Sequence, residues 1–187
     1  MWSRWRTTGV DAAFPTATIA AATFVPNNGA LFIDAGSTTG LFSEFFPNRR
    51  LTVFTNTLSI ATTLANLPAV TVHTLGGKVR PVTLAEVGPQ TIEVLNKHHF
   101  DMAFVGTNSL SLDRGLATPD TDEAAIKAAM IRNSERTFLL ADHSKFAQTS
   151  LVTYAAVEEV DVIVTGNELG EQHRAALEEL DVEVIYT

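Results

Sequence analysis

Short β-rich runs alternate with helical patterns along almost the whole chain, and this alternation is the feature that most limits the fold. The expected strands are residues 31–33, 51–54, 70–74, 100–105, 137–140, 160–164 and 182–185. The expected helices are residues 17–24, 57–67, 88–97, 122–132 and 171–180, with one more that begins within residues 34–39 and ends at residue 46. Such alternation is typical of parallel sheets, because two parallel neighbours need a long crossover connection between them. We therefore predict an α/β fold with a mostly parallel sheet flanked by helices.

The longest stretch without periodicity is residues 106–121, which we expect to be a functional loop.

Composition limits the classes of function. A chain of 187 residues suits one domain. The absence of cysteine excludes disulfides, thiolate metal sites and a cysteine nucleophile. The net charge is −8 and the basic residues are scattered, which argues against DNA binding by this chain itself. No stretch approaches the roughly 20 apolar residues that span a bilayer, and residues 1–10 do not read as a signal peptide. We expect a cytoplasmic protein without a membrane partner.

Small and polar residues follow one predicted strand after another. The carboxyl ends of parallel strands meet at one edge of the sheet, and ligands of open α/β sheets bind there. We expect this edge to hold the binding site. The residues concerned are Asp34, Thr55, Asn56, Gly76, Gly77, Gly106 and Asp142.

The segment from Asp34 to Thr39 is the sharpest local feature. Gly36 allows a tight turn, and the hydroxyls of Ser37, Thr38 and Thr39 lie at a helix start. Unpaired N–H groups and the positive end of the helix dipole favour an anion at such a place. Plain N-capping by Ser or Thr is the simpler alternative. The segment lacks the lysine of a Walker motif and the glycine spacing of a dinucleotide loop.

The other junctions also admit simple explanations. Thr55 and Asn56 suit helix capping, and Gly76 with Gly77 suits a plain turn. Lys145, after the strand that ends near residue 140, can pair with a phosphate as a point charge or lie in a solvated loop.

Charged side chains near the same edge are further candidates. Glu123 and Lys127 form an i,i+4 pair, which is either a surface ion pair or a pair that points into the loop-rich edge. Arg80 is either a bidentate contact to a phosphate or hydroxyl or a surface arginine. We expect ligand selectivity to lie in side chains such as Lys78, Arg80, Glu86 and Asn108.

The five histidines show no metal-binding spacing, and no Gly-x-Ser-x-Gly elbow is present. We therefore predict neither a metal site nor a cofactor.

Taken together in order and spacing, several segments closely resemble the C-terminal sensor domain of the DeoR family of bacterial sugar-metabolism regulators. The resemblance runs from about residue 18 to residue 187. The segments that carry it are Ile33-Asp34-Ala35-Gly36-Ser37-Thr38-Thr39, Thr55-Asn56, Leu75-Gly76-Gly77, Val87-Gly88-Pro89, Phe100-Asp101-Met102-Ala103-Phe104-Val105-Gly106, Gly115-Leu116-Ala117-Thr118-Pro119, Glu123-Ala124-Ala125-Ile126-Lys127 and Leu140-Ala141-Asp142-His143-Ser144-Lys145-Phe146.

The resemblance implies a fold shared with ribose-5-phosphate isomerase, glucosamine-6-phosphate deaminase and CoA transferases. It also implies a homo-oligomer and a phosphorylated sugar or related effector. The loop from Asp34 to Thr39 would cradle the phosphate. The remaining residues that the resemblance places around the same cleft are Thr55, Asn56, Gly76, Gly77, Gly106, Asn108, Glu123 and Lys145.

The chain departs from the family pattern at its N-terminus. Family members carry a helix-turn-helix there, whereas residues 1–16 are too few for that module and are expected to be a linker remnant or an expression scar. Residues 17–187 are expected to form the effector-binding domain, with DNA bound only through the missing N-terminal part. The predicted function is ligand sensing in a transcriptional regulator, without catalysis.

Two alternatives stay open. One is a sugar-phosphate isomerase or deaminase of the related fold, which needs a general base; the candidate bases are Asp34, Asp101, Glu123 and Asp142. The other is an oligomerisation module with an empty site.

Overall fold

The computed structural model describes residues 14–187. Of the predicted linker remnant, residues 1–13 lie outside the described residues, and the first helix, α1 (Phe14–Thr23), already includes its last three.

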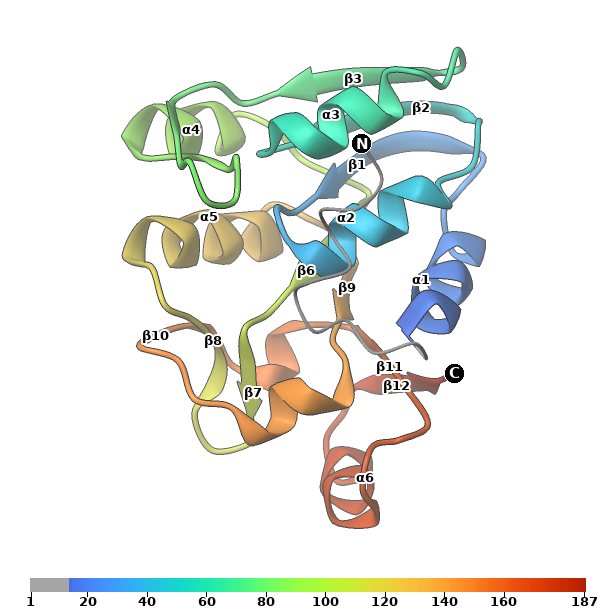
Figure 1. Cartoon of the computed structure of the whole chain (residues 1–187), viewed down its shortest axis with the longest axis vertical. Helices are drawn as coiled ribbons and strands as arrows, with labels where there is room; N and C mark the ends of the chain where they lie inside the picture. The colour runs from blue at the N-terminus through green and yellow to red at the C-terminus, as the bar shows by residue number, and fades with distance from the viewer. Residues whose placement is uncertain (1–13) are drawn as a thin grey trace.

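A sheet of seven parallel strands forms the centre of the molecule (Figure 1). The predicted α/β class with a mostly parallel sheet is thereby confirmed. Neighbouring strands pair in register, so that Ile33 lies between Thr55 on one side and Phe104 on the other. In spatial order the strands are β12 (Glu183–Tyr186), β11 (Val162–Thr165), β9 (Thr137–Leu140), β6 (Met102–Gly106), β1 (Asn28–Ile33), β2 (Arg50–Thr55) and β3 (Val70–Thr74).

The order of the strands reverses between β1 and β6. From β1 the chain builds the sheet outward through β2 and β3, and it then returns to β6 and builds in the opposite direction. The connections that follow β1 and β6 consequently leave to opposite faces of the sheet, and a crevice opens between them at the carboxyl ends of the strands.

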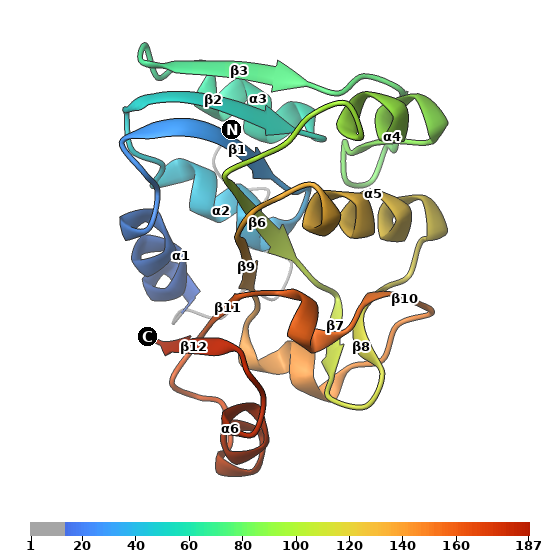
Figure 2. The ribbon, with the colours of Figure 1, turned by 180° about the vertical axis from the view of Figure 1, so that it is seen from behind.

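Helices cover both faces of this sheet (Figures 1 and 2). On β1, Leu31 and Ile33 pack in one apolar cluster and Phe32 in the other, as the period of two in a strand requires. The first face is covered by α1, α2 (Ser37–Glu44) and α3 (Leu58–Leu64). The second face is covered by α4 (Pro89–Leu95), α5 (Thr121–Arg132) and α6 (Glu171–Glu178).

Two smaller sheets lie outside the central one. A two-stranded hairpin joins β4 (Lys78–Val79) to β5 (Glu86–Val87). A three-stranded antiparallel sheet has the order β10 (Val152–Ala155), β8 (Gly115–Thr118), β7 (Ser109–Ser111). The 3₁₀ turns η1 (His143–Ala147) and η2 (Val157–Glu159) flank β10.

The prediction that residues 106–121 form a loop without periodicity is therefore wrong. Most of this stretch is the β7–β8 hairpin, with Leu110 paired to Leu116. Strands this short are below the length at which a period of two can be recognised. Their third partner, β10, also comes from a part of the chain for which no strand was predicted.

No helix among residues 14–187 is both long and apolar enough to cross a bilayer.

We predict that Gly115→Ala destabilises the domain by about 1–3 kcal/mol. Gly115 has a φ of 82°, and a Cβ there would collide with the carbonyl group of Ala155 on the neighbouring strand. Gly40→Ala is the matched control, because Gly40 lies within α2 and a Cβ there meets nothing within 4 Å. That change should raise stability by about 0.5–1 kcal/mol. Urea unfolding measures both, and equal effects of the two changes would contradict the role of Gly115.

Candidate phosphate-binding site at the strand-order reversal

A cavity of about 70 Å³ lies at the crevice between β1 and β6. Its walls come from four separate segments: the first turn of α2, the residues that follow β6, the middle of α5, and η1. The cavity is small compared with the ~300–1,000 Å³ of pockets for drug-sized ligands. The lining residues are Ala35, Gly36, Ser37, Thr38, Gly106, Thr107, Asn108, Lys127 and Lys145.

The first turn of α2 supplies one wall. Gly36 is the N-cap and has no side chain to accept a hydrogen bond, and among residues 14–187 no side chain caps the N–H groups of this turn. The hydroxyl of Thr39 instead donates to the carbonyl oxygen of Gly36 over 3.2 Å. The alternative of capping by Ser or Thr side chains is thus not what the structure contains. The unpaired N–H groups and the positive end of the helix dipole border the cavity through Ser37 and Thr38.

The loop before α2 is held in place from the neighbouring strand. The backbone N–H of Ala35 donates to Oδ1 of Asn56 over 2.9 Å. Asn56 is buried, and so is Thr55, whose hydroxyl accepts a hydrogen bond from the N–H of Thr57 at 3.3 Å. Asn56 therefore supports the loop from behind, whereas Thr55 supports the turn that leads into α3, and neither lines the cavity.

A buried ion pair joins β1 to α5. Asp34 and Lys127 are only 1% and 4% exposed, and the Lys127 ammonium donates to Oδ2 of Asp34. The same carboxylate oxygen accepts the N–H of Gly106 over 3.0 Å, and Lys127 donates to the Gly106 carbonyl oxygen over 2.9 Å. The hydroxyl of Tyr154 donates to that carbonyl as well, over 3.1 Å, and its ring centroid lies 5.7 Å from the ammonium. Lys127 lines the cavity, whereas Asp34 lies behind it and fixes the position of the ammonium.

Burial dominates the electrostatics of this pair. Removal from water raises the pKa of Asp34, and the nearby Lys127 ammonium opposes that rise only in part. Burial likewise raises the pKa of the Tyr154 hydroxyl, which keeps it a neutral hydrogen-bond donor.

Lys145 supplies the second ammonium. It belongs to η1, whose start is capped by Asp142: Oδ1 of Asp142 accepts the N–H of Ser144 at 2.8 Å. The ammonium of Lys145 lies 3.7 Å from Oδ2 of Asp142 and is partly exposed. Two ammonium groups from different elements thus border the same cavity as the helix terminus.

Arg80 and Glu123 form a separate ionic cluster beside the cavity. The Arg80 guanidinium pairs with Glu123, and it lies 3.3 Å from Oδ2 of Asp120. Oε2 of Glu123 accepts the hydroxyl of Thr118 at 3.3 Å, and the same hydroxyl lies 3.0 Å from Oδ1 of Asn108. Asn108 is the member of this cluster that reaches the cavity wall.

The i,i+4 ion pair between Glu123 and Lys127 does not form. Each residue instead pairs across the fold, with Arg80 and Asp34 respectively. The second interpretation, in which both residues point into the loop-rich edge, describes the structure.

The glycines after β3 lie away from the cavity. The buried carboxylate of Glu86 accepts the N–H groups of Leu75 and Gly76, each at 2.8 Å. Gly77 has a φ of 112°, and Lys78 is exposed on β4. None of these residues lines the cavity.

The structure thus divides the predicted site residues into three groups. The residues that line the cavity are Gly36, Ser37, Thr38, Gly106, Asn108 and Lys145. Those that support it or lie beside it are Asp34, Thr39, Thr55, Asn56, Arg80 and Glu123. Those that lie apart are Gly76, Gly77 and Lys78.

Sequence reasoning left Lys127 open between a surface pair and the loop-rich edge, without placing it in the site, and it missed Tyr154. One signal for Lys127 was available, because it lies among buried Ala124, Ile126 and Met130 on α5, where a lysine needs a partner. Tyr154 lies in a segment for which no element was predicted. Among residues 14–187, no group of three His, Asp or Glu side chains is placed to hold a metal ion.

We predict that Asp34→Asn and Lys127→Met each destabilise the domain by about 3–5 kcal/mol, because each leaves an unpaired buried charge. The double variant should lose much less than the sum of the two. Urea unfolding of all four proteins at neutral pH measures this, and additive losses would contradict the pairing.

The loss in Lys127→Met should shrink as the pH falls. The folded-state pKa of Asp34 lies above the ordinary value of 3.8 for an aspartate and rises further without Lys127. Between the unfolded and folded pKa values the folded state holds more protons, so its stability increases as pH decreases. A loss that stays constant from neutral pH down to about pH 4 would contradict this assignment.

Comparison with known proteins identifies the family. Residues 17–167 match the model of the DeoR C terminal sensor domain. The HTH-type transcriptional regulator GlpR of Haloferax volcanii is 35% identical over 156 residues, which are 83% of this chain and 61% of that protein. The glycerol-3-phosphate regulon repressor of Escherichia coli is 30% identical over 142 residues, 75% of this chain and 56% of that protein. The chain thus spans about three-fifths of the length of these relatives.

Solved structures share the fold at low identity. Ribose 5-phosphate isomerase A from Neisseria gonorrhoeae superimposes with a TM-score of 0.54 at 18% identity, over 74% of this chain and 55% of that one. A probable sor operon regulator from Shigella flexneri gives 0.57 at 10% identity, over 86% and 88%. The predicted likeness to the isomerase fold is confirmed. Because the family model covers most of the sequence and relatives reach 35% identity, this chain belongs to the family of DeoR C-terminal sensor domains.

Proposed function

We propose that this domain senses a small phosphorylated metabolite and holds its phosphate group in the cavity at the start of α2. The observation that carries the proposal is the convergence of a helix N-terminus with Lys127 and Lys145 on one cavity. Helix N-termini bind phosphate because their N–H groups are unpaired and the dipole favours negative charge. Hydrogen bonds from ammonium groups to phosphate are among the strong ones.

The electrostatics of the cavity contrast with those of the whole chain. The net charge of −8 repels anions, but at physiological salt this repulsion is largely screened beyond about 8–10 Å. Inside the cavity the fixed donors face the ligand at short range. Asp34 pairs with Lys127, so a bound phosphate would compete with Asp34 for the same ammonium. The Lys127–Gly106 hydrogen bond keeps the ammonium in place during this exchange.

The size of the cavity favours a small effector. A volume of about 70 Å³ accommodates a phosphate group and little more, so the rest of the ligand would extend past Asn108 toward the Arg80–Glu123 cluster. The Escherichia coli relative is named for the glycerol-3-phosphate regulon. A three-carbon polyol phosphate or a sugar phosphate is the class of effector that we propose.

A regulatory rather than catalytic role is supported by the same contacts. Glu123 is engaged by Arg80, and the hydroxyls of Thr83 and Thr118 both lie 3.3 Å from its carboxylate. Asp34 is held by Lys127 and Gly106. Neither carboxylate is therefore poised as a free general base. The relatives are named as regulators, and the isomerase likeness concerns the fold, which does not determine function.

The sensor would act within a longer regulator. The relatives are named as HTH-type regulators, and we propose that DNA is bound by another part of the protein. Effector binding changes DNA affinity only if it favours one of two arrangements of the protein. A homo-oligomer, as the resemblance implies, offers such arrangements through the packing of its subunits.

Binding of glycerol 3-phosphate, ribose 5-phosphate and glucose 6-phosphate tests the proposal, with each unphosphorylated parent compound as the comparison. We expect at least one phosphorylated compound to raise the melting temperature, with no rise for its parent. Lys145→Met should weaken that binding about 10–100-fold in calorimetric titrations, through the loss of a charged hydrogen bond. Lys78→Met is the matched control, since Lys78 is exposed and lies apart from the cavity, and it should change the affinity less than about twofold.

Two results would contradict the phosphate site. One is the absence of binding by every phosphorylated compound. The other is equal weakening by Lys145→Met and Lys78→Met. Ser37→Ala/Thr38→Ala gives a second check, because it removes two hydroxyls from the lining and leaves the ammonium groups in place.

Incubation of the pure protein with ribose 5-phosphate or glucosamine 6-phosphate tests the enzymatic alternative. We expect both compounds to remain unchanged, because the carboxylates of Asp34 and Glu123 are engaged by Lys127 and Arg80. Formation of ribulose 5-phosphate or ammonia above the uncatalysed rate would favour an isomerase or a deaminase instead.

A further inference from the structure

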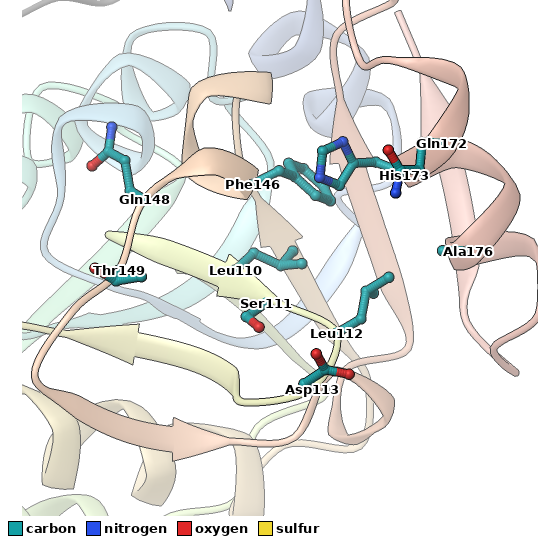
Figure 3. Close-up of a pocket in the computed structure, with 10 residues that line it drawn as sticks. All are labelled: Leu110, Ser111, Leu112, Asp113, Phe146, Gln148, Thr149, Gln172, His173 and Ala176. Carbon is teal, nitrogen blue, oxygen red and sulfur yellow. The ribbon is translucent and has the colours of Figure 1, made fainter.

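A second and larger cavity, of about 300 Å³, lies between the β7–β8 hairpin, the segment that contains η1, and α6 (Figure 3). It shares no lining residue with the phosphate cavity. Its volume reaches the lower end of the range for small-molecule sites.

The inner wall of this cavity is apolar and aromatic. Leu110 and Leu112 come from the hairpin, and Phe146 comes from η1. The ring of Phe146 meets the ring of His173 on α6 edge-on, with centroids 5.5 Å apart and an interplanar angle of 61°, and Figure 3 shows the two rings next to one another. Such a surface suits the C–H faces of a compact organic ligand.

Neutral polar groups complete the lining. Ser111, Thr149 and Gln172 contribute hydroxyl and amide groups, which both donate and accept hydrogen bonds. Asp113 is the only carboxylate among the described lining residues, which include no lysine or arginine. A phosphate or carboxylate ligand would therefore meet repulsion from Asp113, with no lysine or arginine in the described lining to offset it.

We propose that this second cavity binds an uncharged polyhydroxylated ligand, a free sugar or a polyol. Hydroxyl groups match a lining that both donates and accepts, and Asp113 is a strong acceptor for them. The proposal does not depend on the phosphate site.

The two cavities meet at one structural element. Lys145 lines the phosphate cavity and its neighbour Phe146 lines the second one, both within η1. On the side of the β7–β8 hairpin, Asn108 lines the phosphate cavity and Leu110 lines the second one. A ligand that fixes Phe146 also fixes Lys145, so the affinities of the two sites are coupled. This coupling, unlike the second site itself, rests on the proposed phosphate binding.

Two-dimensional NMR titrations of the chain test the second site with glycerol, glucose, fructose and myo-inositol as probes. We expect at least one of them to produce saturable shifts at Phe146 and along α6. Gln172→Ala/His173→Ala should weaken this binding about tenfold, the loss of one or two hydrogen bonds. Gln90→Ala is the matched control, because Gln90 is an exposed glutamine in the first turn of α4 and does not line the cavity.

Three results would overturn the proposal. The first is no saturable shift with any probe up to its solubility limit. The second is stronger binding of the diamine putrescine than of every polyol. The third is polyol binding that Ser37→Ala weakens and Gln172→Ala/His173→Ala does not, which would place the sugar in the phosphate cavity.

Paired titrations separate this inference from the phosphate site. Bound polyol should change the affinity for a phosphorylated effector, and the bound effector should change the affinity for the polyol by the same factor. Polyol binding without phosphate binding would overturn the proposed function and leave the second site standing. Phosphate binding without polyol binding would overturn the second site and leave the proposed function standing. Independent binding of both ligands would overturn the coupling alone.

Discussion

The geometry of this domain depends on the buried contact between Asp34, Lys127 and the peptide group of Gly106. These residues are 93, 72 and 21 positions apart in the chain, and they join the end of β1, the end of β6 and the middle of α5. A buried ion pair adds little net stability, because removing two charges from water costs about as much as their attraction returns. Its value here is positional. The carboxylate behind the cavity and the carbonyl beside it hold an ammonium group at the cavity wall, where the reversal of strand order has already opened a crevice.

Two of the three sheets of the domain border cavities of different character. At the carboxyl end of the parallel sheet, a helix N-terminus and two lysines border one cavity, and this arrangement suits an anion. The antiparallel sheet of β7, β8 and β10 extends beyond the end of β6 and helps to form a larger, mostly uncharged cavity against α6. Because η1 contributes adjacent residues to both, the boundary between the two surfaces is a single turn of 3₁₀ helix. The fold itself does not determine function, since an isomerase and a regulator share it.

Much of the framework was predictable from sequence, whereas the pairing of side chains was not. The strands Val70–Thr74 and Thr137–Leu140 have the predicted bounds. The second is a short apolar run between turn residues, which is typical of a buried strand. The segment that contains Ser37 and Thr38 was identified for the same kind of local reason. For Lys127, helical spacing offered Glu123 one turn away as a surface partner, yet the structure pairs Lys127 with Asp34 at the end of β1. Local spacing shows which residues can meet on one helix but not which residues packing brings to them.

The sequence by itself determined the class of fold, the edge of the sheet that carries the site, and the segment at the start of α2, since each depends on periodicity or on residues close together in the chain. Only the tertiary structure decided that Asp34 supports the cavity rather than lines it, that Lys127 lines it, and that Lys78 and the two glycines after β3 lie apart. It also revealed the β7–β8–β10 sheet and the second cavity. These features depend on contacts between residues tens of positions apart, and burial, not local pattern, selects those contacts.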